Sequence, residues 1–297
     1  MELKHIAGST YYVDDDTNCN IGLYMLNDNR CILIDAGYEQ EAQALLDYLY
    51  ANSLAPAAII NTHGHVDHAG ADKFIKERSG AIVYAPCGES WVIEKPELEM
   101  IGLTGTPSFG TLNDAFLRGR HCHTDVTLQP GVVTIYSVQL NALSLPGHSI
   151  DHMGIATPDN VLFCGDAVYT HEFIKKYKLP YISDVAATLS TLEYLKDMTY
   201  AYYVPSHGTV LRDIRSAVQE NVKLLKDVLG YIVENLYEPV TREELCINIM
   251  KHYHVWMSMP QHFLMMSYTS AFLRYLYEGD IIGPVIENYS LKWKARV

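Results

Sequence analysis

The stretch Thr62-His63-Gly64-His65-Val66-Asp67-His68-Ala69-Gly70 places four side chains that can bind metal within six positions. A short apolar run of β type, residues 56–61, precedes it. A helical pattern over residues 71–80 follows and ends at a glycine. The cluster is therefore expected on a loop between a strand and a helix, where proteins commonly place their chemistry.

The spacing inside this loop divides the four side chains into two sets. His63 and His65 are two residues apart, so both imidazoles can point the same way from an extended backbone. Asp67 and His68 come at the turn into the helix and point elsewhere. A single buried histidine would fit an ordinary hydrogen-bonded role, but three histidines and an aspartate at this spacing indicate a site for two metal ions.

Four further motifs occur along the chain, each beside an expected strand. Residues 34–37 (IDAG) contain Asp35, and residues 145–149 (LPGHS) contain His148. The remaining two are residues 163–167 (FCGDA), with Asp166, and residues 204–208 (VPSHG), with His207. Together with the HxHxDH pattern, these ordered motifs resemble the metallo-β-lactamase superfamily over about residues 8–215.

The resemblance implies an α/β fold, a four-layer αββα sandwich, with a dinuclear site at its edge. It implies that one ion is bound by His63, His65 and His148, the other by Asp67, His68 and His207, and that Asp166 bridges them. Asp35 would support the metal loop from behind. Such a donor set suits two divalent ions, zinc first, with iron or manganese as alternatives.

The implied chemistry is hydrolysis by a metal-bridging hydroxide. Two ions roughly 3.5–4 Å apart lower the pKa of a bound water from 15.7 to about 7. Asp67 would also steer the proton of that water. A second candidate catalytic residue is Tyr169, three residues after Asp166, as in lactonases of the superfamily. Its phenol would donate to the substrate carbonyl oxygen; the alternative is a packed tyrosine with its hydroxyl at the surface.

Three functions are compatible with these motifs. The first is a dinuclear hydrolase of a small ester, thioester or lactone, since glyoxalase II and the lactonases share the full ligand set. The second is a metal-dependent ribonuclease or phosphodiesterase, which the superfamily also contains. The third is a redox enzyme, a mononuclear iron persulfide dioxygenase, which the identity of the ligands does not separate from the first.

Composition bears on partners and compartment. The 297 residues are 48% hydrophobic and carry a formal net charge of -13, which disfavours a nonspecific nucleic-acid binder. Six scattered cysteines without a CxxC and without a preceding signal peptide indicate reduced thiols in the cytoplasm. No apolar run is long enough to span a membrane. A small-molecule substrate is the expected partner, and a homo-oligomer stays open.

Residues 87–125 show no regular pattern and carry several glycines, so we expect a long irregular loop. The resemblance implies that this region shapes the substrate mouth. Its basic side chains are candidates for meeting an anionic substrate group, or are ordinary solvated residues. They are Arg118, Arg120, His121 and His123.

The pattern changes near residue 216, which predicts a catalytic domain over 1–215 and a small, mainly helical domain over 216–297. We expect a helix over 217–236 with a break near Gly230, a helix opened by a capping box at Thr241, a helix over 269–277 and a hairpin over 280–293. This order is winged-helix-like. From residue 230 on, six Lys and Arg face seven Asp and Glu, which favours a structural or pocket-forming tail over a DNA-binding one.

Overall fold

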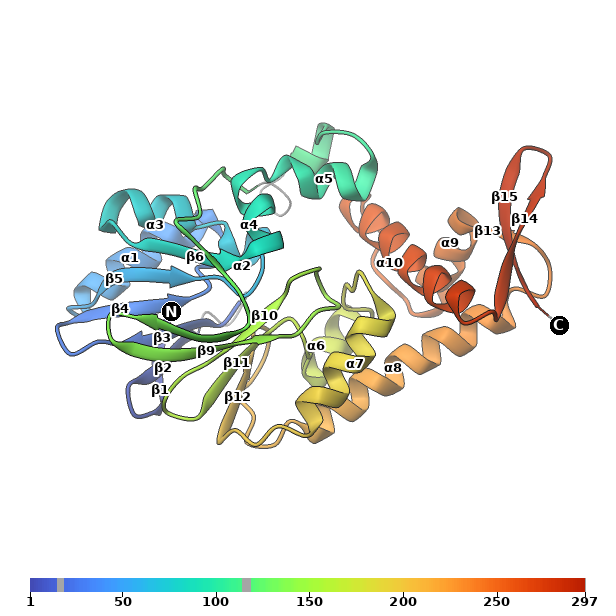
Figure 1. Ribbon diagram of the computed structural model, residues 1–297. Helices are drawn as coiled ribbons and strands as arrows, with labels where there is room; N and C mark the ends of the chain where they lie inside the picture. Colours follow the sequence, from blue (N-terminus) through green and yellow to red (C-terminus); the bar gives the residue numbers. More distant parts are fainter. Residues whose placement is uncertain (15–18, 114–118, 297) are drawn as a thin grey trace.

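Two β-sheets lie face to face, with helices on both outer sides (Figure 1). The computed structural model describes residues 1–14, 19–113 and 119–296. Ile34 and Ile60 of the first sheet share one buried cluster with Ile155 and Phe163 of the second. Because alternate side chains of each strand face this cluster and the others face helices, the layers are helix, sheet, sheet and helix. The predicted sandwich is confirmed.

The first sheet has seven strands in chain order. They are β1 (Glu2–Ala7), β2 (Thr10–Asp14), β3 (Ile21–Met25), β4 (Arg30–Ile34), β5 (Ala55–Ile60), β6 (Ile82–Pro86) and β7 (Val126–Leu128). Pairing is antiparallel up to β4 and parallel from β4 onward. Its outer face is covered by helices α1 (Ala42–Ala51) and α3 (Asp72–Ser79), which bury Leu45, Leu49 and Ile75.

The second sheet has five strands in the order β12-β11-β10-β9-β8. Their bounds are β8 (Gly131–Ile135), β9 (Val138–Ser144), β10 (Met153–Ala156), β11 (Val161–Gly165) and β12 (Tyr202–Pro205). Helices α6 (His171–Tyr177) and α7 (Val185–Lys196) follow β11. His148, Asp166 and His207 each lie in the segment just after a strand, β9, β11 and β12 respectively.

The region predicted to be one long irregular loop contains helices, so that prediction is wrong for residues 87–104. Helices α4 (Cys87–Glu94) and α5 (Glu97–Thr104) are followed by a 3₁₀ turn, η2 (Gly110–Asn113). Met100 packs with Leu112 and Phe263, and this tertiary contact outweighs the low helix propensity of the glycines. Residues 114–118, including Arg118, lie outside the described part of the chain.

The last part of the chain adds three helices and a three-stranded sheet of order β13-β15-β14. The elements are α8 (Arg215–Glu234), β13 (Val240–Thr241), α9 (Arg242–His252), α10 (Met259–Glu278), β14 (Ile282–Glu287) and β15 (Ser290–Ala295). The capping box is confirmed, with the Thr241 side chain and Glu244 each bonded to the other's backbone. The expected hairpin is present as the antiparallel pair β14 and β15.

The predicted break near Gly230 is wrong, because α8 runs through it. Val228 and Ile232 are fully buried on either side, and their burial outweighs the cost of about 1 kcal/mol for a helical glycine. The predicted start of the last helix at Thr269 is also wrong. The helix begins at Met259, where the Ser258 hydroxyl accepts a hydrogen bond from the backbone of Gln261.

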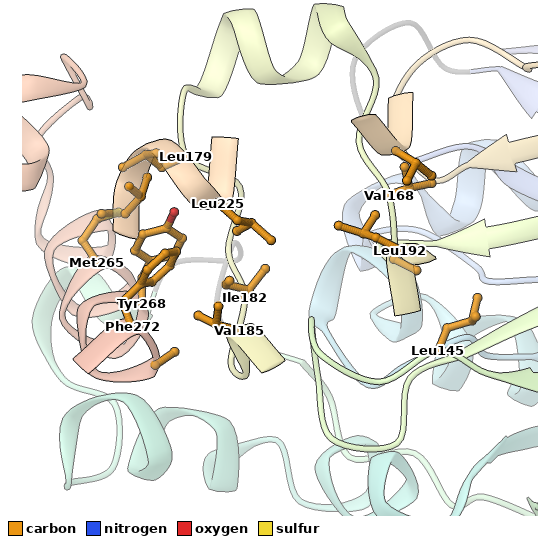
Figure 2. Close-up of a cluster of buried hydrophobic side chains, with 14 of the residues drawn as sticks. Leu145, Val168, Leu179, Ile182, Val185, Leu192, Leu225, Met265, Tyr268 and Phe272 are labelled. Atoms are coloured by element: carbon orange, nitrogen blue, oxygen red, sulfur yellow. The ribbon is translucent and has the colours of Figure 1, made fainter. Parts of the chain in front are cut away.

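The C-terminal helices share a buried core with the second sheet. One cluster runs from Leu145 and Leu192 to Leu225 of α8 and Phe272 of α10 (Figure 2). The division at residues 215/216 and the winged-helix likeness stay predictions. Among the helices of the described residues, none is long and apolar enough to cross a lipid bilayer.

Candidate metal centre

Three histidines from two sheets converge beside the loop that follows β5. The His63 Nε2 and His65 Nδ1 atoms lie 3.1 Å apart, and His148 Nε2 lies 2.8 Å from the same His65 nitrogen. His63 and His148 are buried, and the His65 side chain is 20% exposed. We call these residues the three-histidine group.

A second convergence, which we call the Asp67 group, consists of Asp67, His68 and His207. Asp67 Oδ2 lies 3.6 Å from His68 Nε2 and 3.5 Å from His207 Nε2. Asp67 and His68 belong to α2 (Val66–Ala69), the single turn that ends the metal loop, so they face a different direction from His63 and His65. The two sets deduced from the spacing are adjacent, since the ring centroids of His63 and His68 lie 4.0 Å apart.

Asp166 stands between the two groups. Its Oδ1 lies 3.5 Å from His68 Nε2 and 3.4 Å from His207 Nε2, while its Oδ2 lies 3.7 Å from His148 Nε2. One carboxylate thus presents one oxygen to each group. The structure brings together all seven side chains named as metal ligands from the sequence.

The donor atoms at this centre fit metal ions. His68 Nε2 and Asp166 Oδ1 are buried and form no hydrogen bond within the described residues, an arrangement that costs about 1–3 kcal/mol per atom without a partner. Within each group the ligand-type atoms lie no more than 4.8 Å from one another. Imidazole nitrogens and carboxylate oxygens are the donors that zinc takes in catalytic sites. The residues present therefore suit two divalent ions.

Burial and neighbouring charges set the protonation states of these side chains. Although burial lowers the pKa of His68 and His207, the negative groups around them raise it well above the usual value, so a metal ion would displace a proton from each ring. Burial, together with neighbouring imidazoles, lowers the pKa of His63 well below its usual value and that of His65 to about 3, so both rings are neutral. Burial alone would raise the pKa of Asp67 and Asp166, but the adjacent His68 and His207 lower both. The carboxylates are therefore ionised at neutral pH.

Asp35 holds the metal loop from behind, at the position that the resemblance implies. Its Oδ1 accepts a hydrogen bond from the Thr62 backbone at 2.8 Å, and its Oδ2 lies 2.9 Å from His68 Nδ1. With Nδ1 donating to this carboxylate, Nε2 of His68 is left to face Asp67 and Asp166.

Two supporting residues were missed from the sequence. Glu89 of α4 accepts hydrogen bonds from the backbone of Gly64 and of Asp151, each at 3.0 Å, and so ties the metal loop to the loop that carries His148. His152 Nε2 accepts from the Asp166 backbone at 2.9 Å. The position of His152, four residues after His148, could have identified it from the sequence. Glu89 could not be identified, because it lies in a helix that was predicted as an irregular loop.

Gly165 shows why the motif around Asp166 needs a glycine. Its φ is +57°, and a Cβ there would lie 2.3 Å from His152 Nε2. Any side chain would displace the ring that holds the Asp166 backbone, so the glycine is part of the ligand's positioning.

Tyr169 has its hydroxyl inside the site rather than at the surface. The residue is 5% exposed, and its hydroxyl lies 2.9 Å from His148 Nδ1 and donates to Asp166 Oδ2 at 3.2 Å. The ring stacks on Phe173 with centroids 4.9 Å apart. The packing alternative with an exposed hydroxyl is wrong, and the catalytic role stays a prediction.

The basic residues proposed to meet an anionic substrate group do not line the site. Arg120 pairs with Glu39 and is 62% exposed at its side chain, and His123 pairs with Glu94 at 3.0 Å. His121 is exposed. Among the described members of that set, the alternative of solvated surface residues fits better.

A cavity of about 580 Å³ opens beside the metal centre. Ligands from both groups line it, together with Glu99 of α5, whose pKa is raised to about 8 by burial and by the charges of Asp67 and Glu89. The far side belongs to the C-terminal part of the chain. We call these residues the C-terminal wall: His254, Val255, Trp256, Gln261, Leu264, Met265 and Tyr268.

Comparison with known proteins agrees with this geometry. Residues 14–207 match the family described as the metallo-beta-lactamase superfamily. The chain is 28% identical over 218 residues to hydroxyacylglutathione hydrolase 1 of Vibrio vulnificus, covering 70% of this chain and 69% of that protein. It is 27% identical over 195 residues to the lactamase-like protein adaB of Aspergillus niger, covering 65% of this chain and 50% of that protein. The chain thus spans about half the length of the latter relative.

Solved structures agree on the fold. A metallo-beta-lactamase family protein from Thermus thermophilus superposes with a TM-score of 0.74 at 22% identity, over 94% of each chain. A beta-lactamase domain protein from Burkholderia ambifaria gives 0.72 at 16% identity, over 99% of this chain and 94% of that one. Both superpositions extend through the C-terminal helices, since they cover nearly the whole chain.

Proposed function

Because the chain belongs to the metallo-beta-lactamase superfamily, we propose that it is a dinuclear metal-dependent hydrolase of a small ester, thioester or lactone. The observation that carries this proposal is the position of Asp166, whose two oxygens face the two ligand groups separately. A site for one ion would not need a carboxylate so placed. The named activity of the Vibrio vulnificus relative, hydrolysis of a hydroxyacylglutathione, belongs to the same class.

The ligand assignment follows the two groups. His63, His65 and His148 would hold one ion, Asp67, His68 and His207 the other, and Asp166 would bind both. Such ions, when bound, activate a water molecule at neutral pH and polarise the substrate's carbonyl oxygen. The protein's own part is to fix the ligands' direction through Asp35, Glu89 and the Tyr181 backbone oxygen, which lies 2.9 Å from His148 Nδ1.

Two side chains would act on the substrate and the water. Asp67, ionised and 23% exposed at its side chain, can accept the proton of the attacking water. Tyr169 keeps its proton, because burial raises the pKa of its phenol well above the usual value. Its single O–H, if turned away from Asp166 Oδ2, can therefore donate to an oxygen on which negative charge develops. The net charge of -13 and the largely apolar cavity give no support to a ribonuclease or phosphodiesterase.

Metal analysis paired with a substrate screen tests the proposal. Protein purified without chelator should carry two equivalents of transition metal, zinc first, by elemental analysis. It should hydrolyse an ester, thioester or lactone, lose the activity to chelator and regain it with metal. A stoichiometry of one metal ion per chain under metal-replete conditions would favour the mononuclear dioxygenase. Activity confined to phosphodiesters would establish the ribonuclease or phosphodiesterase function.

A further inference from the structure

The cavity beside the metal centre continues to helix α10. Tyr181 lies at the junction: its ring centroid is 5.8 Å from that of His148, and its hydroxyl lies 3.1 Å from the Ser267 oxygen on α10. Beyond it, Leu264, Met265 and Tyr268 of α10 line the same cavity as the ligands. A substrate whose reacting group meets the metals can therefore extend along this helix.

The C-terminal wall is mostly apolar, and His254 is its one imidazole. None of its seven described residues is a Lys, Arg, Asp or Glu. On the sandwich side, Phe173, Tyr177 and Leu179 add further apolar surface, while the cavity's two lysines, Lys176 and Lys178, are exposed at the end of α6. A charged substituent against the wall would lose its hydration without gaining an ion pair from it, whereas an apolar one gains from burial.

Tyr268 adds one polar atom to this apolar wall. The residue is 1% exposed, and its buried hydroxyl has no hydrogen-bond partner in the described part of the chain. Figure 2 shows its oxygen on the side where Leu179 lies, and both residues line the cavity. A buried hydroxyl without a partner is unfavourable. Because the oxygen is closed off from solvent, an acceptor on a bound molecule would satisfy it once the side chain shifts toward the cavity.

We propose that the substrate carries a neutral apolar arm, of acyl or aromatic type, that lies against α10 and offers an acceptor oxygen to Tyr268. The inference rests on the proposed function, because the arm belongs to the molecule whose ester, thioester or lactone group meets the metals. Leu264 and Met265 select the arm by shape, and Tyr268 selects it by the acceptor. None of these three residues belongs to a sequence motif of the metal centre.

Binding of unreactive probes tests the arm without catalysis. We expect octanamide to bind at least tenfold more tightly than butanamide by titration calorimetry. Leu264→Trp, which fills the cavity from a half-buried position, should remove that preference. The matched control is Ile247→Trp, on the 41% exposed side chain of α9 outside the cavity, which should keep it.

Tyr268→Phe tests the acceptor. It keeps the ring and removes the hydroxyl, so it should weaken binding of an octanamide with a ketone oxygen in mid-chain about fivefold and leave plain octanamide unchanged. Equal effects on the two probes, or none on either, would remove the acceptor from the proposal.

Turnover separates this inference from the proposed function. The metal-loaded protein should hydrolyse p-nitrophenyl octanoate with at least tenfold higher kcat/KM than the acetate, and Leu264→Trp should bring the ratio close to one. Hydrolysis of the acetate, with no preference for the longer chain in binding or turnover, would contradict the proposed apolar arm. The proposed hydrolase function would be unaffected by that result. A tenfold preference for a charged acyl-glutathione over the neutral octanoate would also contradict the apolar arm. If no ester, thioester or lactone reacts, the hydrolase fails, and the amide titrations still decide whether the wall binds an apolar group.

Discussion

The metal centre and the C-terminal wall line one cavity but are built in opposite ways. The centre is polar, and its ligands come from short motifs that each follow a strand end between residues 60 and 207. The wall is apolar and comes from α10 and the segment before it. The difference indicates that the motifs determine the reaction, while an unrelated later segment determines which molecules reach it.

The two regions are also held in place differently. Side chains of the centre are oriented by hydrogen bonds to backbone groups, such as those of Glu89 and Asp35, so small displacements are resisted. The wall is oriented by packing of Met265 and Phe272 in the core shared with the second sheet. Substitutions should therefore affect chemistry in the first region and selectivity or stability in the second.

The largest effect is expected from Asp166→Ala, which removes the carboxylate shared by both ligand groups. Metal and activity should be lost together, because forfeiting the ions removes several kcal/mol of barrier lowering, on the order of 10³-fold or more in rate. Elemental analysis and kcat/KM measure the two losses, and circular dichroism checks the fold. Near wild-type turnover would show that Asp166 is not a ligand.

Tyr169→Phe should come next, because it removes one donor and keeps the ring that stacks on Phe173. We expect kcat to fall about 10²–10³-fold, the usual cost of losing one such donor. Metal content and melting temperature should hold. An unchanged kcat on a substrate that the enzyme hydrolyses would limit Tyr169 to orienting His148 and Asp166.

Glu89→Gln should have a smaller effect, since it alters the support of the metal loop and not a ligand. An amide replaces one of two acceptor oxygens, so an N–H group would face the backbone donor of Gly64 or of Asp151. Loss of such a support typically weakens metal affinity 10–100-fold, about 1.4–2.7 kcal/mol. Competition with a chromophoric chelator measures it. The exposed Glu172→Gln, on α6, is the control and should bind metal as the wild type does.

The smallest effect is expected at the contact between the two regions. Ser267→Ala removes the hydrogen bond between the Tyr181 hydroxyl and α10, and should lower the free energy of unfolding by about 1 kcal/mol in urea titration. Ser190→Ala on the exposed face of α7 removes a hydroxyl bonded only within its own helix and serves as the control. The upper range for one hydrogen bond is about 3 kcal/mol. If Ser267→Ala lowers the free energy of unfolding by more than this, the wall is more tightly coupled to the centre than its hydrogen bonding indicates.

The sequence predicts the centre better than the wall, and the reason is physical. Metal ligands need defined residue types beside strand ends, so His148, Asp166 and His207 can be located by motif and by the strands before them. The sandwich was implied by the family resemblance that these motifs carry. Glu89 could not be located in this way, because any acceptor side chain on a suitably placed helix would serve. The glycines near Glu89 also prevented prediction of the helix that carries it.

The wall was predicted only in part, because the sequence left a structural tail and a pocket-forming tail as alternatives. Met265 and Tyr268 have the composition of an ordinary helix core, and nothing in their spacing distinguishes a side chain that lines a cavity from one that packs in a core. The start of α10 was also missed, since its capping residue, Ser258, follows a run of aromatic and sulfur side chains with no helical period. Which helix faces the site depends on the tertiary arrangement, which local patterns do not encode.

The position of the ligands has a thermodynamic consequence beyond catalysis. His63, His65 and His68 follow a strand of the seven-stranded sheet, whereas His148 and His207 follow strands of the five-stranded sheet. Ions bound between them would join the two sheets as a cross-link does. A ligand that binds only the native state stabilises it by about 4.1 kcal/mol at roughly 1,000 times its dissociation constant. Metal supply would then govern how long the folded chain survives proteolysis, and a cell short of metal would lose the protein as well as its activity.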